Sequence, residues 1–399
     1  MNNKKELQEF KKFQAFQAII LSAGYSKRMK KFKPLLPLGE TTVIENTINN
    51  FKKAGINNIV VILGYKSELL QDYLEKINIK FIINKDYSKG MFSSVKIAVE
   101  NLNKETKAFF ITPVDIPLVK KSTIDNMIKA YNENKASVIC PSYNEKTGHP
   151  ILMSAELRNT ILSYENPEQG LGTVIKNLQY SEGKNQGKNK GTVIKNPQYS
   201  IMNLQVCDRG ILYDLDDEQG YEKVKNYYKT MDIPNKEDIE TIFKLENTDK
   251  KIIKHGEKVS FVASVIGEKL NQKGYNLDIE LIKSASYLHD IAKGNHNHEK
   301  IGAEIIANYG YIKLADIIKN HMDSNLGKRI NEENIVYIAD KLVKEDKIIK
   351  IEDRFYQSIK RYSNEKHIIN NILLRYSKAK ILQRKIEEEI EEELGDIFG

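Results

Sequence analysis

The first half of the chain alternates short apolar runs with amphipathic stretches, a pattern that predicts β-strands separated by helices. Such alternation favours an α/β domain with a parallel sheet covered by helices on both faces. Ligands of these sheets bind where the strands end. The expected strands cover residues 17–21, 59–63, 80–83, 108–112 and 137–140, and the expected helices cover residues 42–54, 67–76, 92–101, 122–132 and about 219–229.

The second half has only helical periodicity, which predicts an all-α domain. Pro234 lies in the polar segment that precedes it, so residues 232–249 are expected to form a linker. We place the helical domain at residues 250–345 and a C-terminal helical extension at residues 346–399. The acidic run at residues 386–394 is expected to be a solvated helix face, with a partner-binding tail as the alternative. The other expected helices cover residues 238–245, 251–271, 278–292, 299–309, 312–322 and 332–344.

Residues 172–200 contain a tandem duplication. The sequence GTVIKNLQYS recurs as GTVIKNPQYS, with Pro197 where the first copy has Leu178, and a polar, Gly-rich stretch joins the copies. Two copies are too few for a solenoid, and long loops cost little stability. We therefore expect a surface loop insert, from which residues 172–190 can be deleted without loss of folding or activity.

Composition describes an ordinary globular protein, with 40% hydrophobic and 29% charged residues. No apolar run approaches the roughly 18–20 residues of a membrane span, and the N-terminal stretch is polar, without a secretory signal. Cys140 and Cys207 are expected in the core of a cytoplasmic protein without a disulfide framework. The net charge of +8 is scattered and accompanies no nucleic-acid-binding motif. The expected partners are therefore small anionic substrates, and neither nucleic acid nor a membrane.

A glycine turn with nearby cations follows the first expected strand. Residues 21–37 read LSAGYSKRMKKFKPLLP, which places Gly24 after the apolar run and Arg28 and Lys33 before the next element. Backbone N–H groups approach phosphate where side chains are absent, and fixed cations offset its charge. The spacing matches neither the Walker sequence nor GxGxxG. Asp115 follows a later apolar strand, and its carboxylate is the oxygen ligand that Mg²⁺ prefers. Together these residues predict a nucleoside triphosphate site.

The loop resembles the signature of MobA-like nucleotidyltransferases, LAAGxSxRMGxxKxLLP. Residues 90–96 (GMFSSVK), 113–119 (PVDIPLV) and 147–150 (TGHP) are similar to later motifs of that family. The resemblance implies a Rossmann-like, Mg²⁺-dependent nucleotidyltransferase domain over residues 16–231, after an N-terminal extension of residues 1–15. Within the family, the sequence is similar to the cytidylyltransferases that complete the molybdenum cofactor. This likeness implies a molybdopterin-type acceptor and, as a partner, a molybdenum hydroxylase that receives the cofactor.

The resemblance also assigns residues to the nucleotide. Ser93 and Ser94, together with Asn84, are expected to contact the base or the ribose, and the alternative for them is helix capping. The implied catalytic residues are Arg28, Lys33 and Asp115, and the implied nucleotide-binding residues are Leu21, Ser22, Ala23, Gly24, Arg28, Lys33, Asn84, Ser93 and Ser94.

Two acidic segments are expected to hold Mg²⁺ in this domain. Asp115 is the first implied ligand, and a second is expected at Asp216 or nearby Asp214, where the family often has DIDTP and this chain has DLDDE. His149 is expected to border the substrate, with a core or turn histidine as the alternative.

The first loop also bears on the choice of base. Cytidylyl-transferring members of the family carry Ala-Gly in this loop and guanylyl-transferring members carry Gly-Gly, so Ala23 and Gly24 favour CTP over GTP. The chain departs from the family pattern at Lys30, where the family usually has Gly, and at Ser22, where it usually has Ala.

A second set of candidate ligands lies in the helical half. Each lies on a separate expected helix or at its end, so the helices can direct these side chains into one bundle interior. Mixtures of His and Asp suit Mn, Fe, Zn or Mg. Lys293 is a candidate phosphate contact, whereas His296 and His367 are expected to bind no metal. The candidate ligands are His255, His289, Asp290, His298, His321 and Asp340.

This pattern resembles the HD phosphohydrolase domain. The core order H…HD…D is present, and His298 and His321 match the two additional histidines of its dinuclear members. The resemblance implies one or two divalent metals and a bridging hydroxide that attacks a phosphate ester. A metal-holding regulatory domain is the alternative.

The sequence therefore predicts a bifunctional enzyme. One half would transfer CMP from CTP to a molybdopterin-type cofactor, and the other would hydrolyse a phosphate ester. One alternative replaces the acceptor with a sugar or alditol phosphate. Another is a non-catalytic molybdenum-cofactor-binding chaperone with a regulatory HD domain.

Overall fold

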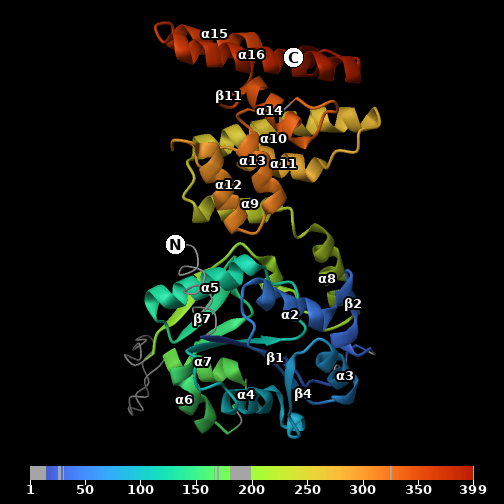
Figure 1. Cartoon of the computed structure of the whole chain (residues 1–399), viewed down its shortest axis with the longest axis vertical. Coiled ribbons are helices and arrows are strands. Elements are labelled where there is room, and N and C mark those ends of the chain that lie inside the picture. The colour runs from blue at the N-terminus through green and yellow to red at the C-terminus, as the bar shows by residue number, and fades with distance from the viewer. Residues whose placement is uncertain are drawn as a thin grey trace, which may run out of the picture. The chain divides into compact units, whose positions relative to one another are not determined.

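The computed structural model describes residues 15–25, 28–29, 31–165, 167–168, 170–179, 199–323 and 326–398. It contains two compact units, residues 1–229 and residues 230–399 (Figure 1). Lys30, the second copy of the duplication up to residue 198, and residues 1–14 of the expected N-terminal extension lie outside the described residues.

The first unit is built on a mixed eight-stranded sheet with the order β10-β7-β9-β6-β1-β4-β5, and β8 pairs with β7 beside this path. Two short strands, β2 (Pro37–Leu38) and β3 (Thr41–Thr42), form a separate hairpin. The strands of the large sheet are β1 (Phe16–Ser22), β4 (Ile59–Leu63), β5 (Lys80–Ile83), β6 (Ala108–Pro113), β7 (Val138–Tyr143), β8 (Lys146–Thr147), β9 (Ile151–Ser154) and β10 (Ile201–Gln205).

Helices cover both faces of this sheet (Figure 1). Ile19 and Leu21 of β1 share an apolar core with α4, α6 and α7. On the other face, Phe51 of α2 packs against Phe110 of β6, with ring centroids 5.6 Å apart. Every residue of β1 is buried, as expected for a central strand covered on both sides. The helical elements of the unit are η1 (Lys33–Leu35), α2 (Val43–Lys53), α3 (Glu68–Lys76), η2 (Tyr87–Lys89), α4 (Met91–Glu100), α5 (Lys121–Asn134), η3 (Ala155–Leu157), α6 (Arg158–Ser163), α7 (Leu171–Gln179), η4 (Arg209–Leu212) and α8 (Glu218–Thr230).

The expectation of a wholly parallel sheet is wrong at β9, which runs antiparallel to both β6 and β7. Residues 144–150 connect β7 to β9 and contain only the two-residue β8. A parallel return needs a crossover of a dozen or more residues, so this short connection forces an antiparallel return. The expected strands at β4 and β5 have the predicted bounds, whereas β9 and β10 were not predicted.

The expectation of a surface loop is wrong for the first copy of the duplication. Residues 171–179 form α7, and Val174 and Leu178 are buried in the core beside α4 and α6. The apolar residues of the copy recur at helical spacing and can therefore cover the sheet.

The second unit is a helical bundle with one short hairpin, β11 (Val343–Lys344) and β12 (Lys347–Ile348). An apolar core of this unit joins α10, α14, α15 and α16, so the C-terminal extension packs into the same core as the bundle. The helices are α9 (Lys236–Leu245), α10 (Lys250–Gln272), α11 (Ile279–Leu288), α12 (His298–Asn308), α13 (Ile312–Asn320), α14 (Glu332–Leu342), α15 (Ile351–Arg361), α16 (Lys366–Ile390) and α17 (Leu394–Phe398).

The segment expected as a linker, residues 232–249, contains α9. A capping box formed by Asn235 and Asp238 starts this helix, and its residues Ile242 and Phe243 are buried. The helix therefore belongs to the folded second unit, which begins at Thr230.

Small residues let α10 and α11 approach closely. A Cβ built on Gly256 would lie 2.2 Å from the carbonyl oxygen of Tyr287. One built on Gly267 would lie 2.9 Å from the Ile279 side chain. The contact at Gly256 involves backbone, which cannot move aside, so this glycine fixes the helix separation next to His255.

The acidic run at residues 386–394 has two faces. Ile386, Ile390 and Leu394 are buried in the core, while exposed Glu392 and Glu391 pair with Lys269 of α10 and with Lys273, the residue that follows this helix. The run therefore covers the end of α16, the turn at residues 391–393 and the start of α17, and it is joined to α10 by ion pairs.

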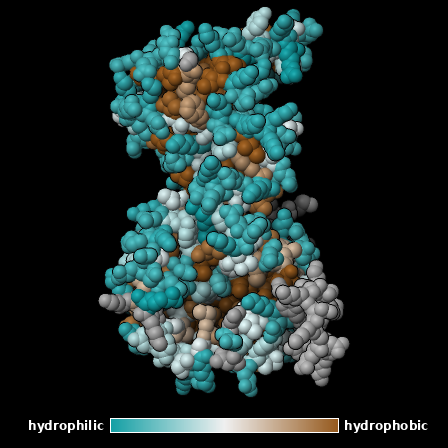
Figure 2. Space-filling model, turned by 180° about the vertical axis from the view of Figure 1, so that it is seen from behind, coloured by the Kyte–Doolittle hydropathy of each residue, from teal (hydrophilic) through white to brown (hydrophobic). Residues whose placement is uncertain are grey.

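On the face shown in Figure 2, hydrophilic residues predominate and hydrophobic residues emerge in separate patches. Among the described residues, no helix combines the length and apolar character needed to cross a bilayer. Cys140 and Cys207 are buried and form no disulfide.

Candidate active sites

The loop after β1 leaves main-chain groups accessible. Leu21 and Ser22 end the strand, and both are buried with Ala23. A Cβ built on Gly24 would meet no described atom within 4 Å, and its φ is outside the left-handed region. Neither conformation nor packing therefore demands glycine at this position. Its absent side chain instead leaves space over the backbone, as a phosphate-binding loop requires.

Two cations and two carboxylates come together beside this loop. Lys33 is only 8% exposed, and its Nζ lies 3.7 Å from Asp115 Oδ2 and 3.3 Å from Asp216 Oδ1. Arg28 Nη2 lies 2.9 Å from Asp216 Oδ2. The backbone N–H of Leu215 donates to the Asp115 carbonyl over 3.1 Å and ties the two acidic segments together. Four residues proposed for the transferase thus lie in one cluster.

The electrostatics of the cluster favour a further cation. Burial raises the pKa of Asp115, and Asp216 and Asp214 raise it further, against the opposing effect of Lys33. The cluster is therefore short of positive charge, which a divalent cation between carboxylates would supply. The residues present fit Mg²⁺, and Asp115 and Asp216 would hold it.

Asn84, Ser93 and Ser94 form a hydrogen-bonded group where β5 meets α4. Asn84 Nδ2 donates to Ser93 Oγ over 2.8 Å and to Ser94 Oγ over 2.9 Å. The N-cap of α4 is Gly90, to whose carbonyl Ser93 Oγ donates, so neither serine caps the helix. The capping alternative is wrong, and a contact with base or ribose stays a prediction.

His149 lies in a tight turn and precedes a cis peptide bond to Pro150. Its backbone N–H donates to the Ile211 carbonyl over 3.1 Å, and its Nδ1 is buried without a hydrogen-bond partner among the described residues. Burial lowers the pKa of His149, so the ring is neutral at pH 7. A neutral ring can bind a substrate without adding charge.

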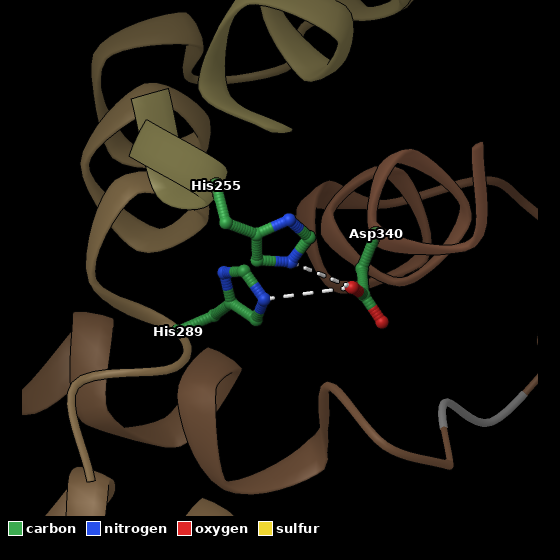
Figure 3. A group of neighbouring side chains, drawn as sticks. All are labelled: His255, His289 and Asp340. Carbon is green, nitrogen blue, oxygen red and sulfur yellow. Dashed lines mark hydrogen bonds and ion pairs between the residues drawn. The ribbon is translucent and has the colours of Figure 1, made fainter. Parts of the chain in front are cut away.

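The six histidine and aspartate candidates of the second unit converge in one interior. In Figure 3, His255, His289 and Asp340 extend from separate segments toward one another. His255 and Asp340 lie within helices, whereas the other candidates lie at or just beyond helix ends. Their positions are α10 for His255, the C-terminus of α11 for His289 with Asp290 following, the start of α12 for His298, the C-terminus of α13 for His321 and α14 for Asp340.

Asp290 faces two groups of histidines with its two oxygens. Its Oδ2 lies 3.5 Å from His255 Nε2 and 3.4 Å from His289 Nε2. Its Oδ1 lies 3.4 Å from His298 Nε2 and 3.8 Å from His321 Nε2. Two sets of ligand atoms, His255 with His289 and Asp340, and His289 with Asp290 and His321, are each compact enough for a metal ion. The two sets share His289, whose Nε2 can bind one metal only, whereas Asp290 offers one oxygen to each group of histidines and could lie between two metals.

The backbone selects the tautomer of three of these histidines. The Nδ1 atoms of His255, His289 and His321 lie 2.6–2.7 Å from the carbonyl oxygens of Glu345, Ser286 and Ile318. Each Nδ1–H donates there, which leaves Nε2 as the ligand atom. The Nε2 atoms of His289 and His321 are buried and lack a hydrogen-bond partner in the described structure. Buried ring nitrogens that make no hydrogen bond within the described protein fit the ligand atoms of a divalent metal.

Charge in this interior is strongly coupled. Burial opposes a charge on His289, but Asp290 and Asp340 outweigh it and raise the pKa of His289 to about 10. Burial and neighbouring His289 lower the pKa of His321 to about 3. A metal would take the place of the proton on His289, because metal binding to histidine releases protons.

The sequence matches the MobA-like NTP transferase domain over residues 18–183 and the HD domain over residues 252–345. The molybdenum cofactor cytidylyltransferase of Escherichia coli (strain K12) is 36% identical over 141 residues, which are 35% of this chain and 70% of the relative. The chain belongs to the MobA-like NTP transferase family. It joins a nucleotidyltransferase domain of this family to an HD phosphohydrolase domain with a His/Asp metal site.

Other matches are more distant or cover less of the related protein. The bifunctional protein GlmU of Staphylococcus epidermidis is 32% identical over 30% of this chain, and the chain spans only 27% of that relative. A solved nucleotidyl transferase from Methanothermobacter is 16% identical, with a TM-score of 0.43, over 54% of this chain and 99% of the other.

Two cations next to the HD-domain ligands were missed from the sequence. Buried Lys341 places Nζ 2.7 Å from Asp340 Oδ2. Arg354 of α15 donates to the Asp340 carbonyl over 2.6 Å and lies 3.2 Å from Asp340 Oδ1. They hold the carboxylate in place and offset its burial. Lys341 could have been found from the sequence, because it is a lysine next to a candidate ligand in an apolar helix. Arg354 could not, because it lies beyond the residues that match the HD domain.

Proposed function

We propose that the first unit transfers CMP from CTP to a molybdopterin-type cofactor, with release of pyrophosphate. The observation that carries this proposal is the meeting of Lys33 with Asp115 and Asp216, with Arg28 beside them, next to the bare loop at Gly24. Cations and carboxylates together are what a metal–triphosphate complex requires.

In this reaction an oxygen of the acceptor attacks the α-phosphorus, the bond to the β-phosphate oxygen breaks, and pyrophosphate leaves with the bonding electron pair. Mg²⁺, when bound by Asp115 and Asp216, supplies positive charge to the phosphates. Lys33 is fixed by burial and two ion pairs, so it can hold a phosphate oxygen without reorganisation. Arg28 is exposed at 71% of its side chain and can follow the triphosphate as it enters.

The choice of nucleotide and acceptor has two supports. The chain has Ala23 before Gly24, as expected for a cytidylyl-transferring member. A relative at 36% identity is named molybdenum cofactor cytidylyltransferase.

For the second unit, we propose hydrolysis of a phosphate ester at the His/Asp site. His255, His289 and Asp340 would hold one metal, and His298 and His321 a second, with Asp290 between them. Two divalent metals supply a nucleophilic hydroxide when bound. Lys293, whose Nζ pairs with Asp290, can reach a phosphate at the same edge of the site.

The test of the transferase is pyrophosphate release by the full chain with Mg²⁺ and molybdopterin-type cofactor, comparing CTP, GTP and ATP. Asp115→Ala should abolish release, whereas Asp125→Ala, an aspartate of α5 paired with Lys121, should not. Sugar and alditol phosphates replace the cofactor in parallel reactions.

We expect pyrophosphate release with CTP and the molybdopterin-type cofactor, and with no other combination of nucleotide and acceptor. Release only with a sugar or alditol phosphate would change the acceptor. Folded protein that binds cofactor but releases no pyrophosphate with any nucleotide would contradict the transferase and favour the chaperone.

A further inference from the structure

A pocket of about 960 Å³ opens beside the metal site of the second unit. His255 belongs both to its wall and to the candidate metal ligands. Lys293, another wall residue, pairs with Asp290. A molecule in this pocket would therefore lie against the edge of the metal site. The volume is at the upper end of the roughly 300–1,000 Å³ that small-molecule sites occupy, and can hold a nucleotide-sized ligand.

Cations outnumber carboxylates in the pocket wall. Among the described residues of the wall, only Glu345 and Asp346 supply negative charge. The cationic wall residues come from the start of α10, the turn after α11, the β11–β12 hairpin and α15. They are Lys251, Lys254, Lys293, Lys344, Arg354 and Arg361.

Three of these cations are already engaged within the protein. Lys293 pairs with Asp290, Arg354 binds Asp340, and Lys344 donates to Gln357. In the described part of the chain, the side chains of Lys251, Lys254 and Arg361 have neither an ion pair nor a hydrogen bond. Unpaired like charges around a hollow repel one another, and an anionic ligand would offset that cost.

The paired and unpaired cations occupy different roles. Lys293 and Arg354 contact metal-site carboxylates and can serve one phosphate at the metals. The three unpaired cations contact no candidate ligand residue, so they are available to a charge elsewhere on the same molecule. Arg361, at the last position of α15, lies outside the residues that match the HD domain. The C-terminal extension therefore contributes one of the three unpaired cations, while α10 contributes the other two.

We propose that this basic pocket recognises a phosphate ester that carries a second phosphate group. One phosphate would face the metal site at His255 while Lys251, Lys254 and Arg361 hold the other. The proposal rests on the phosphohydrolase function proposed above. In the hydrolysis, a water oxygen bonds to phosphorus, the P–O bond to the leaving oxygen breaks, one water proton passes to that oxygen, and the other is released.

The first test measures binding by calorimetry, with Mn²⁺-loaded full chain. Adenosine 3′,5′-bisphosphate is compared with adenosine 5′-monophosphate. The bisphosphate should bind at least about tenfold more tightly, the value of one charge-assisted contact. Lys251→Ala and Arg361→Ala should each remove most of this difference. Lys360→Ala, the neighbouring position on α15 outside the pocket wall, should leave it intact. Dependence on Lys251 and Arg361 assigns the binding to this pocket and not to the transferase site.

The second test follows hydrolysis of p-nitrophenyl phosphate, which has one phosphate only. The two pocket variants should keep the wild-type rate with this substrate and show a raised KM for the bisphosphate. Equal affinity of the wild type for the two nucleotides would overturn the proposal. So would variants that lose the same activity with the monophosphate substrate as with the bisphosphate. Selective bisphosphate binding without hydrolysis of any ester would leave the pocket assignment standing and overturn the phosphohydrolase.

Discussion

The two candidate sites differ in how much of the metal's surroundings the protein supplies. In the helical unit, His289, Asp290, His321 and Asp340 are almost completely buried, and the backbone orients the rings. In the transferase unit, Arg28 is largely exposed and Asp216 is partly so. The protein alone brings the candidate ligands of the first site together, whereas we expect the phosphates of the nucleotide to supply further ligands at the second.

The difference follows from how each fold places side chains. Five helices, α10 to α14, surround the candidate ligands of the helical site, and the Glu345 carbonyl of the β11–β12 hairpin accepts a hydrogen bond from His255. The transferase site lies where strands end at an open edge, which leaves room for a triphosphate but less protein around the acidic side chains. A buried cluster binds metal on its own, and an open edge binds it together with substrate.

Replacing Asp290 with alanine should have the largest effect, because this carboxylate faces both metal positions. Bound metal should fall sharply. Loss of a residue that only supports a metal ligand lowers activity by up to about 100-fold. Asp290 faces the metals directly, so hydrolysis should fall by at least that much. Metal content and p-nitrophenyl phosphate hydrolysis measure the two effects. Pyrophosphate release should be unchanged, as should every property of the control His296→Ala. Metal content equal to the wild type would show that the buried cluster is not the metal site.

Lys33→Met should affect only the transferase. It leaves Asp115 and Asp216 without their buried cation, and transfer should slow by about 100-fold, as for loss of a positioned charge-stabilising donor. Steady-state pyrophosphate release gives the change. Lys31→Met, an exposed neighbour, is the matched control. A rate equal to that of Lys31→Met would mean that Lys33 serves packing alone.

The contrast between the sites also shows what the sequence could predict. The candidate ligands of the helical site came from residue types and their order, and all lie in one interior. The order could not show that Asp290 divides its oxygens between two sets of histidines. It also gave no sign of Arg354, because α15 reaches Asp340 only through tertiary packing.

In the α/β unit, central strands were predictable because burial on both faces makes them continuously apolar. The bounds of β4 and β5 agree with the sequence expectation. The partner and direction of β9 were not predictable from its own residues, because the short connection from β7 decides them. The first copy of the duplication is a helix and not the predicted loop, because Val174 and Leu178 recur at helical spacing and are buried in the core.

Gly256→Ala would test whether close helix packing maintains the enclosed site. A Cβ at this position would collide with the Tyr287 carbonyl oxygen beside His255. Overpacking of this kind costs about 1–3 kcal/mol, so the thermal transition of the helical unit, identified by its shift with metal, should fall and metal binding should weaken. Gly302→Ala is the control, because its Cβ would meet only side chains, at 3.3 Å or more. Equal behaviour of the two variants would show that the α10–α11 separation does not set the site geometry.

Deleting one copy of the repeat should have the smallest effect on activity of the changes considered. Either of two deletions removes one copy, and both lie in the transferase unit. Deleting residues 180–198 leaves the sequence GTVIKNLQYS, whereas deleting residues 172–190 leaves GTVIKNPQYS. The two products differ only in Leu or Pro at position 178, where Leu178 is buried near the end of α7. The first deletion should keep wild-type stability. The second should lose up to about 3 kcal/mol, the cost of proline within a helix. Denaturant unfolding of the transferase unit measures both, with pyrophosphate release as the activity readout. Equal stability of the two products would show that α7 tolerates proline at this position near its C-terminal end. Loss of pyrophosphate release in both deletion products would instead indicate that the duplicated copy contributes to the transferase site.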